Sequence, residues 1–183
     1  MKIILASASP RRAELIRRLG CDVKIVPSSA EECALPDAER TAVVNARLKA
    51  MSVPADGGIV LGADTVVVSE NNGPLGKPHS EEEAFAMLKG LCGRTHEVIT
   101  AVCLTDGARV AEAAEKTKVT FAPFDEKIVR GYIATGKPFD KAGGYGVQDE
   151  EIAPLVAGIE GDRDNVVGLP VGLVRKLLRE NFL

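Results

Sequence analysis

The chain has 183 residues, of which 45% are hydrophobic and 27% charged, and its formal net charge is -3. This length and composition are typical of a globular core, and no apolar run approaches the length that crosses a bilayer. Only five Phe, two Tyr and no Trp are present. With no long basic run either, the composition disfavours a membrane partner and a polymeric nucleic acid partner.

The length favours one domain over residues 1–183, or at most two small lobes that share one core, and the N-terminus and the cysteines indicate a cytoplasmic protein. The first seven residues enter a predicted strand directly and lack the long apolar region of a signal peptide. The four cysteines, at positions 21, 33, 92 and 103, show no CxxC spacing. We expect them to be reduced and structural.

A first strand over residues 2–7 leads into a helix that is predicted to stop at Gly20. Ser9 suits the N-cap of this helix and Pro10 suits its first position. Arg11 and Arg12 then lie on the first turn, where the helix dipole favours acidic residues instead. The pattern indicates a bound oxyanion or phosphate at the helix N-terminus. The alternative is an ordinary cap followed by two solvated arginines.

One carboxylate interrupts the most apolar strand of the chain, predicted over residues 57–68. Burying the lone ionised side chain of Asp64 there costs several kcal/mol or more unless a cation or a metal compensates it. Gly62 and Ala63 leave space in which a ligand could approach. An Asp64 that merely ends the strand ranks second, because three valines continue the strand pattern after it.

The rest of the chain is predicted to alternate between helices, strands and turns. Residues 137–148 form a glycine-rich loop with little packing capacity, which is typical of a functional or mobile segment. The other predicted elements are strands at 22–27, 96–105, 111–121 and 152–159, helices at 37–51, 84–91, 126–134 and up to 178, a capping box at 80–83, and turns at 71–73 and 161–165.

An ordered set of short motifs spans nearly the whole chain and resembles the Maf family of nucleotide pyrophosphatases. The motifs are Ser7-Ala8-Ser9-Pro10-Arg11-Arg12, Glu31-Glu32, Lys49, Gly62-Ala63-Asp64-Thr65, Gly76-Lys77-Pro78, Asp140-Lys141-Ala142-Gly143 with Gln148, and Asn165-Val166-Val167-Gly168-Leu169-Pro170. The chain departs from the family after Gln148, where Asp149-Glu150-Glu151 replace a common glycine.

The resemblance implies an α/β fold like that of the inosine triphosphate pyrophosphatases: an elongated mixed sheet with flanking helices, in two lobes around a cleft. It also implies hydrolysis of a nucleoside triphosphate to the monophosphate and pyrophosphate with a divalent cation, Mg²⁺ or Mn²⁺. Such an activity would serve nucleotide pool control or division arrest. The chain contains no GxxxxGK[ST] motif, which argues against a P-loop enzyme.

Residue chemistry and resemblance together give each predicted site residue a role. Asp64 is expected to deprotonate or orient the attacking water and, with Glu32, to hold the metal through hard oxygen ligands. The triphosphate is expected to contact the capping Ser9 and the cations Arg11, Arg12, Lys49 and Lys77.

Gln148 is expected to read the base, since its amide matches the O4 acceptor and N3–H donor of uracil or thymine. Arg11, Thr65 and Gln148 also resemble the branch acting on dTTP and UTP, with modified pyrimidine nucleotides left open. In a regular strand Asp64 and Thr65 face opposite sides, so both can contact one ligand only if the strand bends or ends there. A non-catalytic nucleotide-sensing regulator of cell division is the alternative function, and a homodimer stays open.

Overall fold

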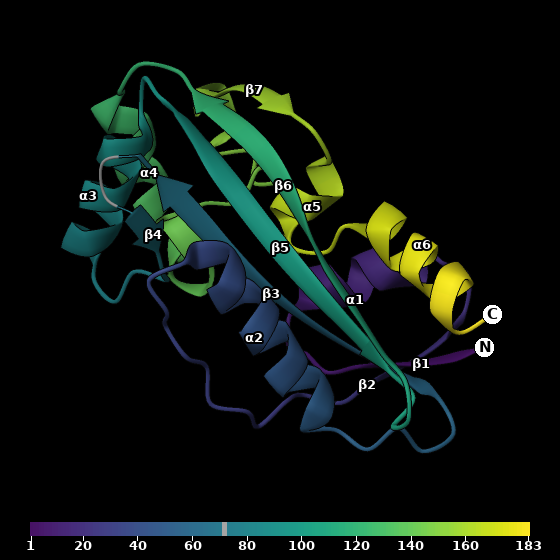
Figure 1. Cartoon of the computed structure of the whole chain (residues 1–183). Helices are drawn as coiled ribbons and strands as arrows, with labels where there is room; N and C mark the ends of the chain where they lie inside the picture. The colour runs from purple at the N-terminus through teal and green to yellow at the C-terminus, as the bar shows by residue number, and fades with distance from the viewer. Residues whose placement is uncertain (71–72) are drawn as a thin grey trace. The chain divides into compact units, whose positions relative to one another are not determined.

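The computed structural model describes residues 1–70 and 73–183 (Figure 1). The strands are β1 Lys2–Leu5, β2 Asp22–Ile25, β3 Ile59–Ser69, β4 Gly73–Leu75, β5 Thr95–Thr105, β6 Val110–Phe121 and β7 Val156–Glu160. The α-helices are α1 Pro10–Arg17, α2 Ala38–Met51, α3 Glu81–Leu91, α4 Glu126–Ala134, α5 Arg163–Val167 and α6 Val171–Asn181, and the 3-10 helices are η1 Lys137–Asp140, η2 Ala142–Gly144 and η3 Ala153–Leu155.

The described residues form one mixed sheet with the strand order β2-β1-β3-β5-β6-β7, and β4 pairs with β3. β1 runs parallel to both β2 and β3. β4 runs antiparallel to β3, and β7 antiparallel to β6. The predicted α/β class, with a mixed sheet and flanking helices, is therefore confirmed. No helix in residues 1–70 and 73–183 is long and apolar enough to cross a bilayer.

The chain divides into two compact units. Unit 1 comprises Met1–Thr65, Thr100–Glu115 and Gly168–Leu183, and unit 2 comprises Val66–Ile99 and Lys116–Val167. The boundaries fall within β3, β5 and β6, so each of these long strands contributes residues to both units.

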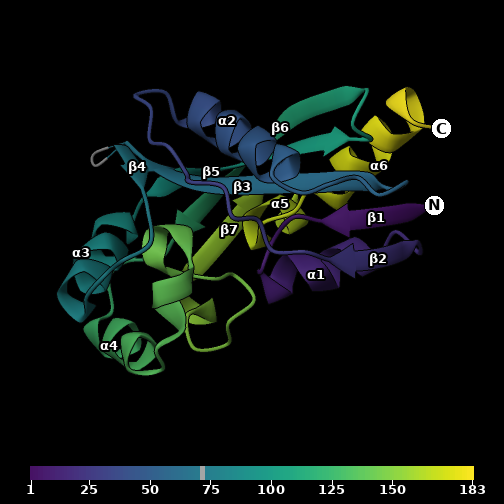
Figure 2. The same ribbon diagram turned by 90° about the horizontal axis from the view of Figure 1, so that it is seen from below.

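In unit 1, helices α1 and α2 lie on opposite sides of β3 (Figure 2). α1 begins as predicted, with Pro10 in its first turn and the Ser9 side chain accepting from the Arg12 backbone N–H at 3.4 Å. α2 approaches β3 closely at Gly62, where a Cβ would collide with the Ala46 carbonyl oxygen and lie 2.6 Å from the Ala50 nitrogen. A glycine is therefore required beside Asp64 for helix packing, besides any space it leaves for a ligand.

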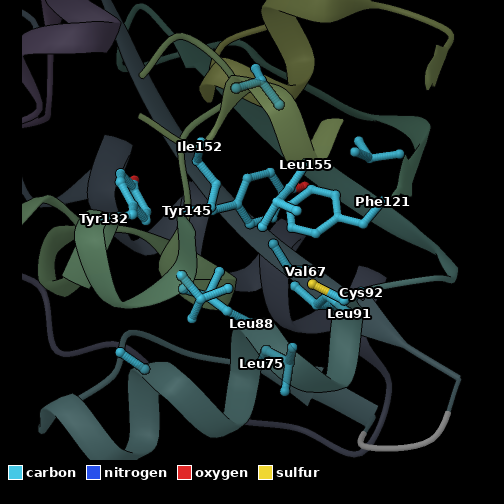
Figure 3. Close-up of a cluster of buried hydrophobic side chains, with 14 of the residues drawn as sticks. Val67, Leu75, Leu88, Leu91, Cys92, Phe121, Tyr132, Tyr145, Ile152 and Leu155 are labelled. Atoms are coloured by element: carbon cyan, nitrogen blue, oxygen red, sulfur yellow. The ribbon is translucent and has the colours of Figure 1, made fainter. Parts of the chain in front are cut away.

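Unit 2 is built around an apolar cluster to which α3, α4, β5 and β6 contribute (Figure 3). Phe121 and Tyr145 meet edge to face with ring centroids 4.8 Å apart. His96 joins them through a 2.6 Å hydrogen bond between its Nε2 and the Tyr145 hydroxyl. Burial lowers the pKa of His96 to about 4, so the imidazole is neutral at physiological pH.

The segment 137–148 differs from its prediction as a loop with little packing capacity. It contains η1 and η2, and its Tyr145 and Val147 are core residues at 5% exposure each. Gly143, at φ +69°, makes this possible because its backbone packs against Val67 while its N–H donates to the Gly76 carbonyl. Because the segment is rich in glycine, its sequence did not predict that Tyr145 and Val147 enter the core.

Three further boundaries differ from the sequence prediction. The strand predicted over 152–159 begins only at Val156, because Pro154 lies in the 3-10 turn η3. The turn predicted at 161–165 contains the start of the short helix α5. The last helix continues past residue 178 to Asn181. The turn predicted at 71–73 falls largely on Asn71 and Asn72, which lie outside the described residues.

Candidate active site

Asp64 is buried in the middle of β3, at 6% exposure. Its Oδ1 accepts from the Lys49 ammonium at 2.6 Å and its Oδ2 accepts from the Asn45 side-chain amide at 3.3 Å. Both donors come from the face of α2 that packs on the strand. Of the two kinds of compensation expected for a buried carboxylate, a cation or a metal, the cation is present here as Lys49.

The Lys49 ammonium joins two carboxylates. Besides Asp64, it pairs with Glu32 Oε1 at 2.8 Å. Glu32 lies in the loop before α2, and its side chain is 54% exposed, against 9% for Asp64. Lys49, predicted to hold phosphates, thus has carboxylate partners in this structure.

Asn45 holds the loop that carries Glu32. Its Oδ1 accepts from the Cys33 N–H at 2.9 Å, and its Nδ2 donates to the Cys33 carbonyl at 3.0 Å as well as to Asp64. Asn45 was not among the site residues predicted from the sequence. A signal existed, because Asn45 is a polar residue on the buried face of an amphipathic helix, one helical turn before Lys49.

Thr65 points to the other side of β3, where it contacts α1. Its Oγ1 accepts from Arg12 Nη2 at 3.1 Å and lies 2.9 Å from the hydroxyl oxygen of Thr100. Arg12 Nε also donates to the Gly168 carbonyl at 2.8 Å. β3 continues to Ser69 without ending. Asp64 and Thr65 accordingly have partners on opposite faces, as expected for neighbours in a strand.

The Arg12 guanidinium is held partly away from water. Burial lowers its pKa from the ordinary value, while the negative charge of Asp64 opposes that shift and the neighbouring Arg11 reinforces it. Guanidinium groups stay protonated even so. Ser9 caps the helix from which both arginines project, so these three of the residues predicted to bind the triphosphate lie at one helix N-terminus.

Lys77 and Gln148 belong to unit 2. The Lys77 side chain is exposed beside the buried Pro78. Gln148 is exposed too, and its Nε2 donates to Asp149 Oδ1 at 3.2 Å. The structure thus brings Glu32, Lys49 and Asp64 together in unit 1, and Ser9, Arg12 and Thr65 around α1 in the same unit.

Glu32 and Asp64 are the predicted metal ligands, and the chemistry of this pair suits a hard divalent cation. Their oxygens already share one positive group, the Lys49 ammonium. Across residues 1–70 and 73–183 no group of three or more His, Cys, Asp or Glu side chains is arranged to hold a metal ion. Two carboxylates fit Mg²⁺, which keeps several waters and takes phosphate oxygens as further ligands.

Comparisons with known proteins agree with the motifs. The family described as Maf-like protein matches residues 2–181. Three similar relatives are named dTTP/UTP pyrophosphatase. They come from Thermosipho africanus (47% identical, covering 97% of this chain and 92% of the relative), Thermococcus gammatolerans (45%, covering 98% and 97%) and Moorella thermoacetica (47%, covering 97% and 93%). The family resemblance inferred from the motifs is confirmed.

Proposed function

Because the chain belongs to the Maf family, we propose that it hydrolyses dTTP and UTP to the nucleoside monophosphate and pyrophosphate, the activity for which its relatives are named. The observation that carries the proposal is the Asp64 carboxylate, buried in an apolar strand and held by the Lys49 ammonium at 2.6 Å. A carboxylate held in a fixed orientation by two donors can orient a water molecule and act as its general base.

In the proposed reaction Asp64 orients a water molecule and takes a proton from it as the water oxygen bonds to the α phosphorus. The anhydride bond between the α and β phosphates breaks, and its electron pair leaves with pyrophosphate. Lys49 holds the Asp64 carboxylate in place through Oδ1, and Asn45 holds it through Oδ2. These two contacts fix the direction of the base before substrate binds, which favours catalysis by positioning.

Cationic side chains neutralise the triphosphate. Arg11 and Arg12 project from the N-terminus of α1, where the positive end of the helix dipole also favours anions. Lys77, exposed on unit 2, is the further cation assigned to the phosphates. Arg12 is oriented by the Thr65 hydroxyl and the Gly168 carbonyl, so its guanidinium needs little reordering when an anion binds.

Glu32 and Asp64 would hold the divalent cation. When bound, such a cation supplies Lewis-acid stabilisation of the charge that develops on the phosphate oxygens. In this assignment the Lys49 ammonium keeps its contact with the Asp64 carboxylate, and a further N–H of the same ammonium donates to a phosphate oxygen.

Gln148 is assigned to the base. Its amide offers a donor for O4 and an acceptor for N3–H, the edge common to uracil and thymine. Gln148→Glu would place an acceptor-only group opposite O4 and should lower kcat/KM for UTP and dTTP by about tenfold or more. Activity on guanine nucleotides should fall less or rise, and an unchanged ranking of substrates would remove Gln148 from this role.

The test of the function is pyrophosphate release by the purified chain with Mg²⁺ or Mn²⁺ and a panel of dTTP, UTP, CTP, GTP and ATP. Release from dTTP and UTP in preference to the others is expected, and preparations of Asp64→Asn control for contaminating phosphatases. Nucleotides that raise the melting temperature without any release would instead favour the nucleotide-sensing regulator.

A further inference from the structure

We infer that Asp149 is a positioning residue that locks the side-chain amide of Gln148 in the orientation for uracil and thymine and against cytosine. The inference rests on the proposed function, in which Gln148 reads the base. It deepens that function by assigning the pyrimidine discrimination to a residue next to the base reader.

The contact that fixes the orientation is the hydrogen bond from Gln148 Nε2 to Asp149 Oδ1, at 3.2 Å. An ionised carboxylate only accepts hydrogen bonds. The amide nitrogen must therefore face Asp149. Rotating the amide by half a turn would bring Gln148 Oε1 against a carboxylate oxygen, two acceptors in contact with no proton between them, and this orientation is disfavoured.

Asp149 is itself held firmly. Its other oxygen, Oδ2, accepts from the Tyr132 hydroxyl at 2.5 Å and lies 3.3 Å from the Lys141 ammonium. Tyr132 is fully buried, and burial, together with its hydrogen bond to Asp149, raises the pKa of its hydroxyl. Tyr132 therefore stays a proton donor at physiological pH, and the Asp149 carboxylate cannot turn freely away from Gln148.

The backbone leaves room for this arrangement at Gly146. A Cβ there would collide with Gln148 Nε2 and lie 2.7 Å from Lys141 Cε and 3.0 Å from Asp149 Oδ2. The Gly146 N–H donates to the Tyr132 hydroxyl at 3.1 Å. Because position 146 is a glycine, the Gln148 amide can lie beside the Asp149–Lys141 pair. The side chain of a larger residue at position 146 would occupy that space.

The numbers of hydrogen-bond donors and acceptors on the Gln148 amide explain the preference for uracil and thymine over cytosine. The amide of Gln148 has two N–H donors and one acceptor, and Asp149 takes one donor. The second N–H and Oε1 then match O4 and N3–H of uracil or thymine. Cytosine offers an amino donor and an N3 acceptor, so it requires the flipped amide that Asp149 opposes. Discrimination between UTP and CTP follows from this repulsion, because a site can gain specificity by disfavouring the wrong ligand as well as by binding the right one.

The test is Asp149→Asn, which keeps the shape but can present either an N–H or a carbonyl oxygen to Gln148. The ratio of kcat/KM for UTP to that for CTP should fall about tenfold. Glu150→Gln is the matched control, because it removes the same charge from an adjacent exposed side chain and should leave the ratio unchanged. Calorimetric Kd values for UMP and CMP provide a second readout that does not depend on turnover.

A purely structural role for Asp149 predicts another pattern. Loosening the turn would lower activity on UTP and CTP equally and leave their ratio unchanged. In a Gln148→Ala background, where no amide is left to orient, adding Asp149→Asn should have no further effect on the ratio. If Asp149→Asn lowers the melting temperature too far for assay, Asp149→Ser tests the same point, because its hydroxyl both donates and accepts.

The outcomes separate the inference from the function on which it rests. Hydrolysis of UTP with an unchanged UTP-to-CTP ratio in folded Asp149→Asn would overturn the inference and leave the function standing. Absence of pyrophosphate release from UTP and dTTP by the wild-type chain would overturn the function, and the inference with it.

Discussion

Each unit contains a buried lysine between one largely buried and one exposed carboxylate. In unit 1, Lys49 has Asp64 and Glu32 as partners, with side chains 9% and 54% exposed. In unit 2, Lys141 has Asp149 and Asp140, 12% and 58% exposed.

The two clusters differ in how the fold assembles them. The partners of Lys49 come from a loop, a helix and a strand, so its geometry depends on packing α2 against β3. Those of Lys141 lie within nine residues of it in the chain, joined by Tyr132 of α4. The same ionic arrangement thus serves two uses in our assignment: in unit 1 it directs a base towards water, and in unit 2 it directs an amide towards a nucleobase.

The largest expected effect separates these two uses. Asp64→Asn keeps the shape and the Asn45 and Lys49 neighbours but loses basicity, so kcat for UTP should fall by about a thousandfold. Asp149→Asn should retain most of the UTP turnover. Near-normal pyrophosphate release by a folded Asp64→Asn protein would remove Asp64 from the role of base.

Removing each buried lysine tests whether the clusters are alike in stability. Lys49→Met and Lys141→Met each leave a buried carboxylate without its ammonium partner, so each should lower the free energy of unfolding by about 3 kcal/mol. Only Lys49→Met should also lower kcat, by about a hundredfold. Urea unfolding and steady-state kinetics on both variants measure the difference, and equal kinetic losses would contradict the division of roles.

The pH dependence of the unfolding free energy is a further difference between the two units, because both histidines of the chain lie in unit 2. Burial lowers the pKa of His96 to about 4, below its ordinary value of about 6.5. Stability from the neutral imidazole is complete above about pH 6.5 and is lost as the pH falls towards 4, by about 3 kcal/mol in total. His96→Gln should flatten this part of the curve of unfolding free energy against pH. His79→Gln, at an exposed site, should not.

The smallest expected effect concerns Arg12, a cation of unit 1 that is proposed to contact the phosphates. Arg12→Ala removes the hydrogen bonds to Thr65 and Gly168 and a proposed phosphate contact, and should lower kcat/KM for UTP about tenfold or more. Arg17→Ala, an exposed arginine at the other end of α1, serves as control. Equal losses in the two variants would place the phosphates elsewhere.

Local chemistry allowed most of the secondary structure to be predicted. Ser9 and Ser80 cap the helices that they were expected to begin, and Asp37 and Asp125 cap the helices predicted over 37–51 and 126–134. A side-chain acceptor satisfies the first free N–H groups whatever the rest of the fold does. The capping box at α3 is half present. The Ser80 hydroxyl accepts from Glu83 N, while the Glu83 carboxylate accepts from His79 N in place of Ser80 N.

The sequence by itself also identified Asp64, because a carboxylate in an apolar strand is anomalous against its immediate neighbours. It marked Asp149 only as part of a departure from the family pattern and could not assign it a role, because the partners of its carboxylate are not evident from the sequence. Only the tertiary structure decided that Lys49 lies between Glu32 and Asp64 and that Asp149 faces Gln148. Ion pairs and amide orientations depend on distances of a few Å in space, and those distances are set by how helices and turns pack.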